Sequence, residues 1–250
     1  MVGLLLNSRG AHMKWSKISD TGKVRQNNED SLLVCEDLKL FAVADGMGGH
    51  KAGEVASQLA LQVLEKELKS SIYRQENPVD ILRKAVLEAN ASVYNLSHNN
   101  LSYRGMGTTV TAACIMGKDL YIAHVGDSRG IIISNGMINQ LTEDHSFVQK
   151  LINEGEITSE EARVHPRRNI ITRALGTEPV LEVDIYSYTV KRGDLVLLCT
   201  DGLTNHLLDR EIQDMLINAS DLDHGLQSLL ALALERGGQD NITAILVEIE

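Results

Sequence analysis

The sequence predicts an α+β fold in which packed antiparallel β-sheets carry helices on their outer faces. The first observation is the order of the expected elements: strands, two helices, more strands, two more helices and a last strand, without regular βαβα alternation. The second is size, because a chain of 250 residues that is 43% hydrophobic can bury one large core. We find no internal repeat or linker, so we expect a single domain over residues 13–250.

The first half of the chain predicts three strands followed by two amphipathic helices. A helix over 52–69 keeps its apolar residues, from Val55 to Leu64, on one stripe. A second helix is expected from Pro78, a residue suited to a first helical turn, to about Leu96. The strands are predicted over 14–20, 31–36 and 39–45.

The second half predicts most of the remaining sheet. Apolar runs indicate strands near 107–117, 119–125, 129–134, 180–190, 194–200 and 242–249, and helices near 209–217 and 222–236. The segment from about Thr142 to Gly176 is polar, contains short helical patterns and lies between strands. Because it is long for such a connection, we interpret it as a functional flap.

Charge and cysteine content restrict the partners. The chain has 24 Lys and Arg against 34 Asp and Glu, and this net charge of -10 argues against nucleic-acid binding, which depends on a basic face. No apolar stretch approaches the length of about 20 residues that spans a bilayer. Cys35, Cys114 and Cys199 lie in apolar runs without Cys-x-x-Cys spacing, which favours buried thiols in a reducing cytoplasm.

The first twelve residues are set aside. Gly10-Ala11-His12-Met13 is typical of the remnant of an expression tag, and Leu4-Leu5-Leu6 is too short for the core of a signal peptide. Residues 1–12 are therefore expected to contribute nothing to function.

Acidic residues stand beside glycines at the ends of several predicted strands. Asp45-Gly46 and Asp201-Gly202 each follow an apolar run, Gly126-Asp127 follows another, and Asp240 precedes the last. Any one such Asp could simply form a turn. Carboxylates within about 4 Å of each other repel by about 4 kcal/mol at an effective dielectric constant near 20, so a shared rim would require protons or metal ions.

Six sequence motifs that contain these residues follow one another along the chain. They are Arg25-x-x-Asn28-Glu29-Asp30, Ala44-Asp45-Gly46-Met47-Gly48-Gly49, Gly105-Met106-Gly107-Thr108-Thr109, Gly126-Asp127-Ser128-Arg129, Thr200-Asp201-Gly202 and Gly238-x-Asp240-Asn241. Together they resemble the protein phosphatase 2C family, the metal-dependent serine/threonine phosphatases, and most closely its compact bacterial members. The resemblance covers Met13 to Glu250. It implies a central antiparallel β-sandwich flanked by α-helices on both sides, with a two-metal centre at one end.

The resemblance also implies a set of metal ligands. Asp45 would bridge two Mn²⁺ or Mg²⁺ ions, Asp201 and Asp240 would complete one ion, and the carbonyl of Gly46 would bind the other. Glu29 and Asp30 would serve this second ion, directly or through water. Asp127 would share a third, weaker ion with Asp201. Oxygen-only ligands suit Mg²⁺ or Mn²⁺, and no Cys/His set suggests zinc.

The remaining motif residues would support the chemistry. Arg25 would hold two phosphate oxygens with its planar guanidinium group. Asn241 and Thr108 are expected behind the metal ligands, although Thr108-Thr109 could merely open a strand. Arg129 is expected to pair near the Asp127 turn.

The proton donor is left open. Many relatives carry a His directly after the first Asp-Gly, where this chain has Met47. His145, at the start of the flap, is a candidate acid, and a metal-bound water is the alternative. His50 is expected to pack at a helix start, and His124 to lie in the core.

The resemblance implies that the protein hydrolyses phosphoserine and phosphothreonine on other proteins, through attack of a water that bridges the metals. Its partners would include a cognate Hanks-type Ser/Thr kinase, and it would act as a cytoplasmic monomer. Two alternatives are a phosphoprotein-binding module without activity, which would have lost a metal acid, and a two-metal nuclease or nucleotide hydrolase. The second would need a basic groove or stacking aromatics, yet aromatic residues make up 4% of the chain.

Overall fold

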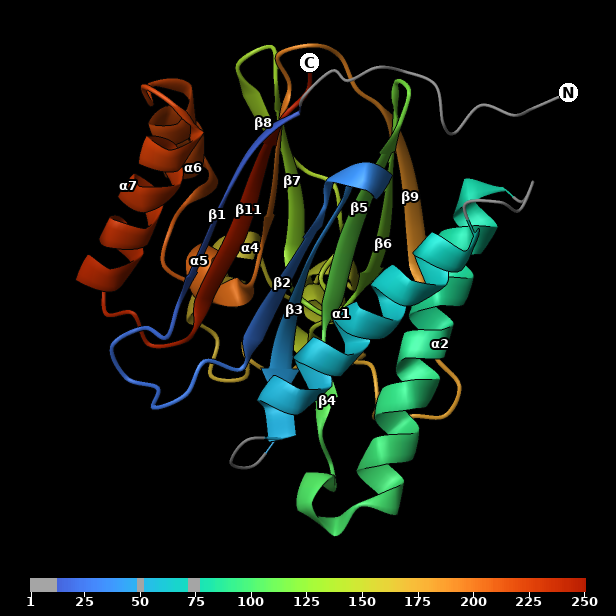
Figure 1. Cartoon of the computed structure of the whole chain (residues 1–250). Helices are drawn as coiled ribbons and strands as arrows, with labels where there is room; N and C mark the ends of the chain where they lie inside the picture. Colours follow the sequence, from blue (N-terminus) through green and yellow to red (C-terminus); the bar gives the residue numbers. More distant parts are fainter. Residues whose placement is uncertain (1–12, 49–51, 72–76) are drawn as a thin grey trace, which may run out of the picture.

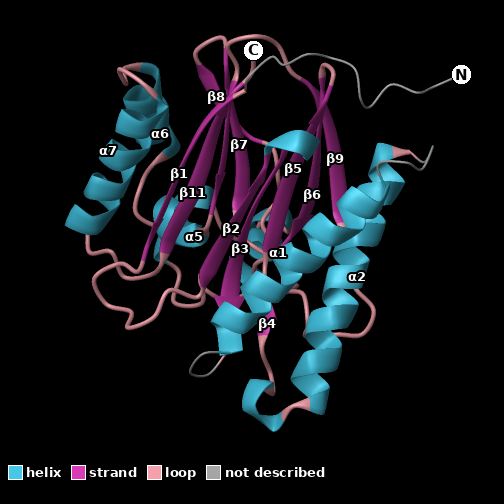
Figure 2. Cartoon of the chain, in the orientation of Figure 1, coloured by secondary structure: helices cyan, strands magenta, loops and turns pink. Residues whose placement is uncertain are grey.

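Two antiparallel β-sheets stack face to face at the centre of the computed structural model, which describes residues 13–48, 52–71 and 77–250 (Figures 1 and 2). The first sheet has the strand order β1 (Lys14–Asp20), β11 (Ile242–Glu248), β10 (Leu195–Cys199), β7 (Arg129–Ser134) and β8 (Met137–Gln140). The second has the order β2 (Asp30–Cys35), β3 (Leu40–Met47), β5 (Val110–Met116), β6 (Asp119–Val125) and β9 (Asp184–Thr189), with β4 (Gly107–Thr108) beside the end of β3.

The strands β5, β10 and β11 and most of β3 are almost continuously apolar because both of their faces are buried. In β3, Phe41 and Val43 point into the layer between the sheets, where they join Leu198 and Ile245 of the first sheet. The alternate residue Leu40 belongs to a separate core beneath the helices. Alternation of side chains along a strand thus serves two cores at once.

Helices cover the outer face of each sheet, as Figure 1 shows. The second sheet carries α1 (Ala52–Ser71) and α2 (Pro78–Asn99), and the first carries α6 (Asp209–Ile217) and α7 (Leu222–Glu235). Asn77 and Asp221 begin α2 and α7 by accepting hydrogen bonds from backbone N–H groups of the first turns. The predicted class, an α+β sandwich with helices on both sides, is confirmed.

The flap segment contains two short helices, α3 (Phe147–Asn153) and α4 (Ser159–Val164). Ser146 caps α3, and Thr158 with Glu161 forms a reciprocal capping box at α4. Two 3₁₀ turns, Glu36–Leu38 and Leu101–Tyr103, complete the helical elements of the described residues.

Several predicted boundaries were wrong. The strand expected over 107–117 is divided into β4 and β5 at Thr109, and β9 begins at Asp184 rather than near 180. The strand β8 was not predicted, although the turn before it, Asn135-Gly136, has the two positive φ angles of a tight hairpin turn. The helix α5 (Asp201–Thr204), which begins two residues after the end of β10, was not predicted either.

The three cysteines are free and buried, as expected. Within the part of the chain that the structure describes, no helix combines the length and apolar character needed to cross a membrane. The predicted tag remnant, residues 1–12, and His50 lie outside the described residues.

Candidate metal centre

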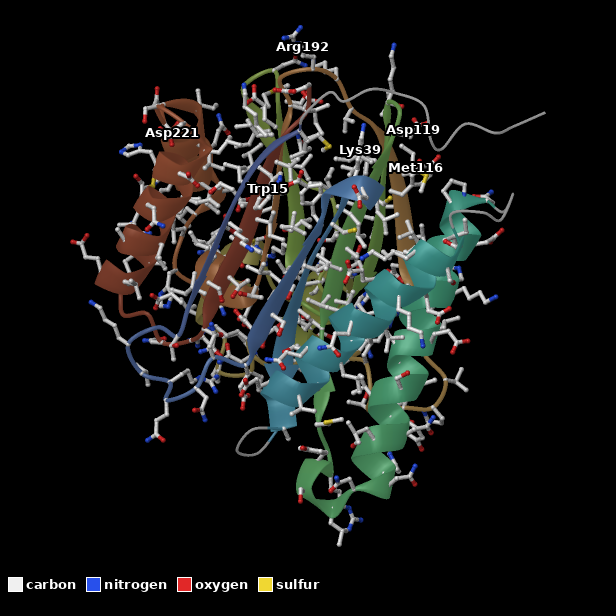
Figure 3. The ribbon with its side chains drawn as sticks, viewed as in Figure 1. Trp15, Lys39, Met116, Asp119, Arg192 and Asp221 are labelled. Atoms are coloured by element: carbon white, nitrogen blue, oxygen red, sulfur yellow. The ribbon has the colours of Figure 1, made fainter. Side chains whose placement is uncertain are left out.

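One end of the sandwich gathers the acidic residues of the motifs. Strand β3 ends here with Asp45 and Gly46, β10 leads here into Asp201, and β11 starts here after Asp240, at the lower end in Figure 1. In the register of β2 and β3, Asp30 lies directly opposite Asp45. Figure 3 labels four residues at the opposite end of the sandwich, Lys39, Met116, Asp119 and Arg192.

The backbone of Asp45 is fixed from β4 and β5. Its N–H donates to Thr109 Oγ1 at 2.9 Å. Its carbonyl accepts from Thr108 Oγ1 and from the Thr109 N–H, each at 2.9 Å. Thr108 therefore lies behind Asp45, where the motif predicts it, and Thr109 is a positioning residue that we did not single out. Both threonines are buried, so Asp45 has a rigid support.

Gly46 sits where no side chain fits. A Cβ at this position would lie 2.1 Å from the carbonyl oxygen of Gly53 and 2.5 Å from that of Glu29. The Glu29 carboxylate is close by, because a Cβ on Gly53 would lie 2.5 Å from Glu29 Oε2 and 2.8 Å from the carbonyl carbon of Gly46. Glu29 and the Gly46 peptide thus border the same narrow space.

Asn241 holds the loop that carries Glu29. Its Oδ1 accepts the N–H of Glu29 at 2.8 Å, and its Nδ2 donates to the carbonyls of Thr21 and Asn27 at 2.9 and 3.0 Å. These three bonds use every hydrogen-bonding group on the side chain except one lone pair. Asn241 therefore supports the loop that carries Glu29.

Asp201 and Asp30 each keep one carboxylate oxygen without a partner. Asn205 donates to Asp201 Oδ2 at 2.9 Å, and Thr200 Oγ1 donates to Asp30 Oδ2 at 2.8 Å. The other oxygen of each carboxylate is buried, and no described group donates a hydrogen bond to it. A buried polar atom without a partner costs about 1–3 kcal/mol, and more when it is charged. Both atoms are therefore suited to receive a cation or a proton.

The acidic side chains at this end of the sandwich, which we call the acidic rim, repel one another. Burial, followed by the charge of Asp30, raises the pKa of Asp45 well above its usual range, and Asp201, Asp127 and Asp240 add to the effect. Burial is also the largest cause that raises the pKa of Asp30 to about 7 and that of Asp201 to about 6. Such groups release protons when a cation binds beside them.

The donor set fits hydrated divalent ions. Among the residues that the structure describes, no three His, Cys, Asp or Glu side chains converge closely enough to hold one ion by themselves. Mg²⁺ usually keeps several waters and takes only one or two carboxylates from the protein, and Mn²⁺ prefers the same oxygen ligands. The spaced carboxylates, the two partnerless oxygens and the Gly46 carbonyl match this mode of binding.

Arg25 lies at the open side of the rim. Its Nη2 donates to Asp240 Oδ2 at 2.8 Å, and 52% of its side chain is exposed. The guanidinium group is thus held next to the acids while part of it faces solvent. This placement brings the predicted phosphate ligand and the predicted metal ligand Asp240 together.

The Asp127 turn is fixed by His145. The Gly126 N–H donates to His145 Nδ1 at 3.0 Å, and the Gly126 carbonyl accepts the His145 N–H at 2.7 Å. His145 Nε2 lies 3.1 Å from Asp184 Oδ2. Because both ring nitrogens are engaged, we withdraw His145 as a candidate proton donor and regard it as a support for the Asp127 turn.

Two neighbouring residues behave as the sequence predicts. His124 is fully buried, with ring nitrogens 2.9 Å from Thr111 Oγ1 and 3.0 Å from the Glu143 carbonyl oxygen. Arg129 forms a two-pronged ion pair with Asp144 at 2.6–3.0 Å.

The flap helices face Asp127 and Asp201 across a cavity of about 370 Å³. Arg163 of α4 closes one side of it by donating to the carbonyls of Thr204 and Leu207 at 3.2 and 3.0 Å. The flap therefore lies over the acids that the family resemblance assigns to a third ion.

Known proteins share this sequence and architecture. The protein phosphatase 2C family model matches residues 11–242. The serine/threonine phosphatase Stp of Listeria welshimeri is 41% identical over 235 residues, which cover 92% of this chain and 93% of that protein. The crystal structure of the Mycobacterium tuberculosis serine/threonine phosphatase PstP/Ppp superposes with a TM-score of 0.89 at 38% identity, covering 95% of this chain and 99% of that one.

A solved structure with bound metal is similar as well. The catalytic domain of the serine/threonine protein phosphatase PstP in complex with two manganese ions has a TM-score of 0.85 at 37% identity, and covers 94% of this chain and 97% of that chain. The family match spans nearly the whole described structure, including every motif residue of the rim up to Asn241. The chain belongs to the protein phosphatase 2C family.

Proposed function

We propose that this protein is a metal-dependent phosphatase that removes phosphate from phosphoserine and phosphothreonine in other proteins. The observation that carries the proposal is the acidic rim itself, where five aspartates share one end of the sandwich and two buried carboxylate oxygens have no partner among the described residues. Relatives that are 40–41% identical over more than nine-tenths of this chain are serine/threonine phosphatases by name.

The ligands proposed for two ions are Asp45, the Gly46 carbonyl, Asp201 and Asp240, with Glu29 and Asp30 close to the second ion. When bound, Mn²⁺ or Mg²⁺ would supply an activated water and neutralise charge on the phosphoryl group. Asp127 together with Asp201 is proposed to bind a third, weaker ion beneath the flap. Thr108, Thr109 and Asn241 hold these ligands through the backbone bonds described above.

Arg25 is proposed to anchor the substrate phosphate. A planar guanidinium group can donate two parallel hydrogen bonds to phosphate oxygens, and Arg25 stands next to Asp240 with half of its surface free. For Arg25→Ala we expect mainly a raised KM for p-nitrophenyl phosphate. A large fall in kcat with KM unchanged would contradict this anchoring role.

The natural substrates are proposed to be phosphorylated proteins of the cytoplasm, including a cognate Hanks-type Ser/Thr kinase, with the phosphatase acting as a monomer. The acidic net charge of -10 argues against nucleic acid as a substrate. The reading as an inactive binding module is disfavoured because every acid that the family pattern requires is present at the rim.

One experiment separates these functions. The purified protein is incubated with a phosphothreonine peptide and with an oligonucleotide, each in Mn²⁺ and in EDTA. We expect phosphate release from the peptide in Mn²⁺ only. Absence of release at every Mn²⁺ concentration would overturn the proposal, and release from the oligonucleotide would favour the nuclease alternative.

A further inference from the structure

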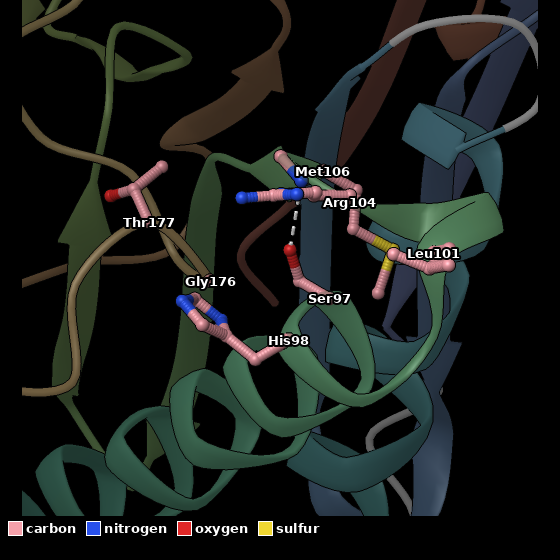
Figure 4. Close-up of a pocket in the computed structure, with 8 residues that line it drawn as sticks. Ser97, His98, Leu101, Arg104, Met106, Gly176 and Thr177 are labelled. Atoms are coloured by element: carbon pink, nitrogen blue, oxygen red, sulfur yellow. Dashed lines mark hydrogen bonds between the residues drawn. The ribbon is translucent and has the colours of Figure 1, made fainter.

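A second hollow, of about 530 Å³, lies at the C-terminal end of α2 (Figure 4). Its walls come from the end of that helix, from the turn that follows it and from the segment after the flap. Its main side chains are those of Ser97, His98, Leu101, Arg104, Met106 and Thr177. None of the proposed metal ligands lines it.

The hollow adjoins the metal centre through two contacts. Met47, which follows Gly46, pairs in register with Gly107. A Cβ on Gly107 would lie 2.6 Å from Met47 Cε and 3.1 Å from Thr177 Cγ2, so these two side chains are close neighbours. Met47, at the strand end that carries Asp45, therefore lies close to Thr177, which lines the hollow.

Hydrogen bonds between side chains and backbone groups of the protein fix the walls of the hollow. Asn90 accepts the N–H of Gly176 at 2.8 Å and donates to the Glu178 carbonyl at 3.1 Å. Ser97 Oγ accepts the N–H of Gly105 at 3.1 Å. These backbone groups are occupied, so side chains provide the polar groups that a ligand would meet.

Arg104 and His98 give the hollow a polar, partly cationic lining. Figure 4 shows both side chains and Thr177 around the same space. His98 Nδ1 donates to the Tyr94 carbonyl at 3.0 Å, which leaves Nε2 free of that bond. No Asp or Glu lines the hollow, and none of the ion pairs between described residues includes Arg104.

This lining contrasts with the rest of an acidic protein, whose net charge is -10. Arg104 is exposed, and an exposed guanidinium group on an acidic protein favours an anionic partner. A single guanidinium group balances one carboxylate. Leu101, which is 85% exposed, lines the same hollow and offers apolar contact to a bound chain.

We propose that this hollow binds an acidic residue of the phosphoprotein substrate that flanks the phosphorylated residue, with Arg104 paired to its carboxylate. The inference rests on the proposed phosphatase function and adds a sequence preference to it. An extended peptide advances about 3.3–3.6 Å per residue, so a residue a few positions from the phosphate can reach past Met47.

The test compares two phosphothreonine peptides that differ only in flanking Glu or Gln residues. For the wild type we expect a higher kcat/KM with the Glu peptide. Arg104→Gln should lower this preference by up to about fivefold, the upper limit for an exposed ion pair. Arg104→Glu should reverse the charge preference, so that a third peptide with flanking Lys residues is preferred over the Glu peptide. Arg192→Gln, at the opposite end of the sandwich (Figure 3), is the matched control and should keep the wild-type preference.

Three results would overturn the inference: an unchanged preference in Arg104→Gln, an equal loss in Arg192→Gln, or a larger gain from a flanking phosphoserine than from Glu. Failure of the proposed function is distinguishable, because the wild type would then release no phosphate from either peptide or from p-nitrophenyl phosphate in Mn²⁺.

Discussion

The same dipeptide, Asp-Gly, lies within the last residues of β3 and just after β10, yet the chain continues in different ways. At Asp45-Gly46 the backbone stays extended, because Gly46 and Met47 pair with β4. At Asp201-Gly202 the backbone turns into α5, and Gly202 packs so closely on the Asn241 carbonyl that a Cβ would lie 2.0 Å from that oxygen. Neighbouring strands, rather than the dipeptide, decide which form is taken.

The ends of β3 and β10 also support their carboxylates differently. Backbone and hydroxyl groups of Thr108 and Thr109 fix the main chain of Asp45. After the end of β10, Asn205 donates to the carboxylate of Asp201 itself, and Thr200 donates to the carboxylate of Asp30. The end of β3 therefore presents a backbone carbonyl and a carboxylate together, whereas the end of β10 presents a carboxylate held by side chains.

The largest predicted effect concerns turnover. Asp45→Asn and Asp201→Asn should each lower kcat with saturating Mn²⁺ to less than one-tenth of wild type, a barrier increase of more than about 1.4 kcal/mol. The loss of turnover should be greater for Asp45, because the charges of several neighbouring acids act on its carboxylate. Phosphate release from a phosphothreonine peptide measures this, and a variant above one-tenth would remove its acid from the proposed metal ligands.

The next effect is on stability without metal. The pKa of Asp201, about 6 in the folded protein, lies above the value of about 3.9 in an unfolded chain, so the folded state holds the proton more tightly. This contribution to stability is complete below about pH 4 and is lost as pH rises through about 6. In EDTA at about pH 7, Asp201→Asn should therefore raise the free energy of unfolding by on the order of 2 kcal/mol.

Urea unfolding of the EDTA-treated proteins at several pH values checks this prediction. The advantage of Asp201→Asn over wild type should shrink toward about pH 4, where the native carboxyl is protonated. Asp119→Asn, at the opposite end of the sandwich, is the control and should show no such trend. An advantage that stayed constant with pH would mean that the raised pKa of Asp201 is not its cause.

A further effect on stability distinguishes the hydroxyl groups that support Asp30 and Asp45. Thr200 Oγ1 donates to Asp30 and accepts the Thr243 N–H, so Thr200→Val leaves two buried groups without partners and should cost about 2–4 kcal/mol. Thr108→Val removes one donor from the Asp45 carbonyl, which keeps the Thr109 N–H, and should cost about 1 kcal/mol. Urea unfolding in EDTA measures the stability cost of each variant. A cost for Thr108→Val that equals or exceeds that for Thr200→Val would contradict the predicted difference.

Residue pattern alone predicted the parts of the fold that depend on burial. The stripe from Val55 to Leu64 predicted α1, and the apolar runs before Asp45 and Asp201 predicted β3 and β10, because buried faces dictate apolar spacing. Family resemblance added the grouping of the acids at one end. The structure then placed Asp30 opposite Asp45 in the register of β2 and β3, with Asp201 near enough for its charge to raise the pKa of both, which no local pattern specifies.

The features that were missed depend on distant partners. Thr109 interrupts a strand because its hydroxyl and N–H bond to Asp45, far away in sequence. His145 was one candidate for the proton donor, beside a metal-bound water, yet Gly126 and Asp184 occupy its nitrogens. Only β8 had a local signal, the Asn135-Gly136 turn, that could have predicted it.

Calorimetric titration of Mn²⁺ into the EDTA-treated and then desalted protein tests the central claim, that acids from both strand ends together hold the ions. We predict that the wild type binds at least two ions and releases protons near pH 6, because the pKa values of Asp201 and Asp30 are raised to about 6 and about 7. Asp45→Asn should lose this binding, while Asp119→Asn should retain it. Two ions bound by Asp45→Asn with wild-type affinity would contradict the account.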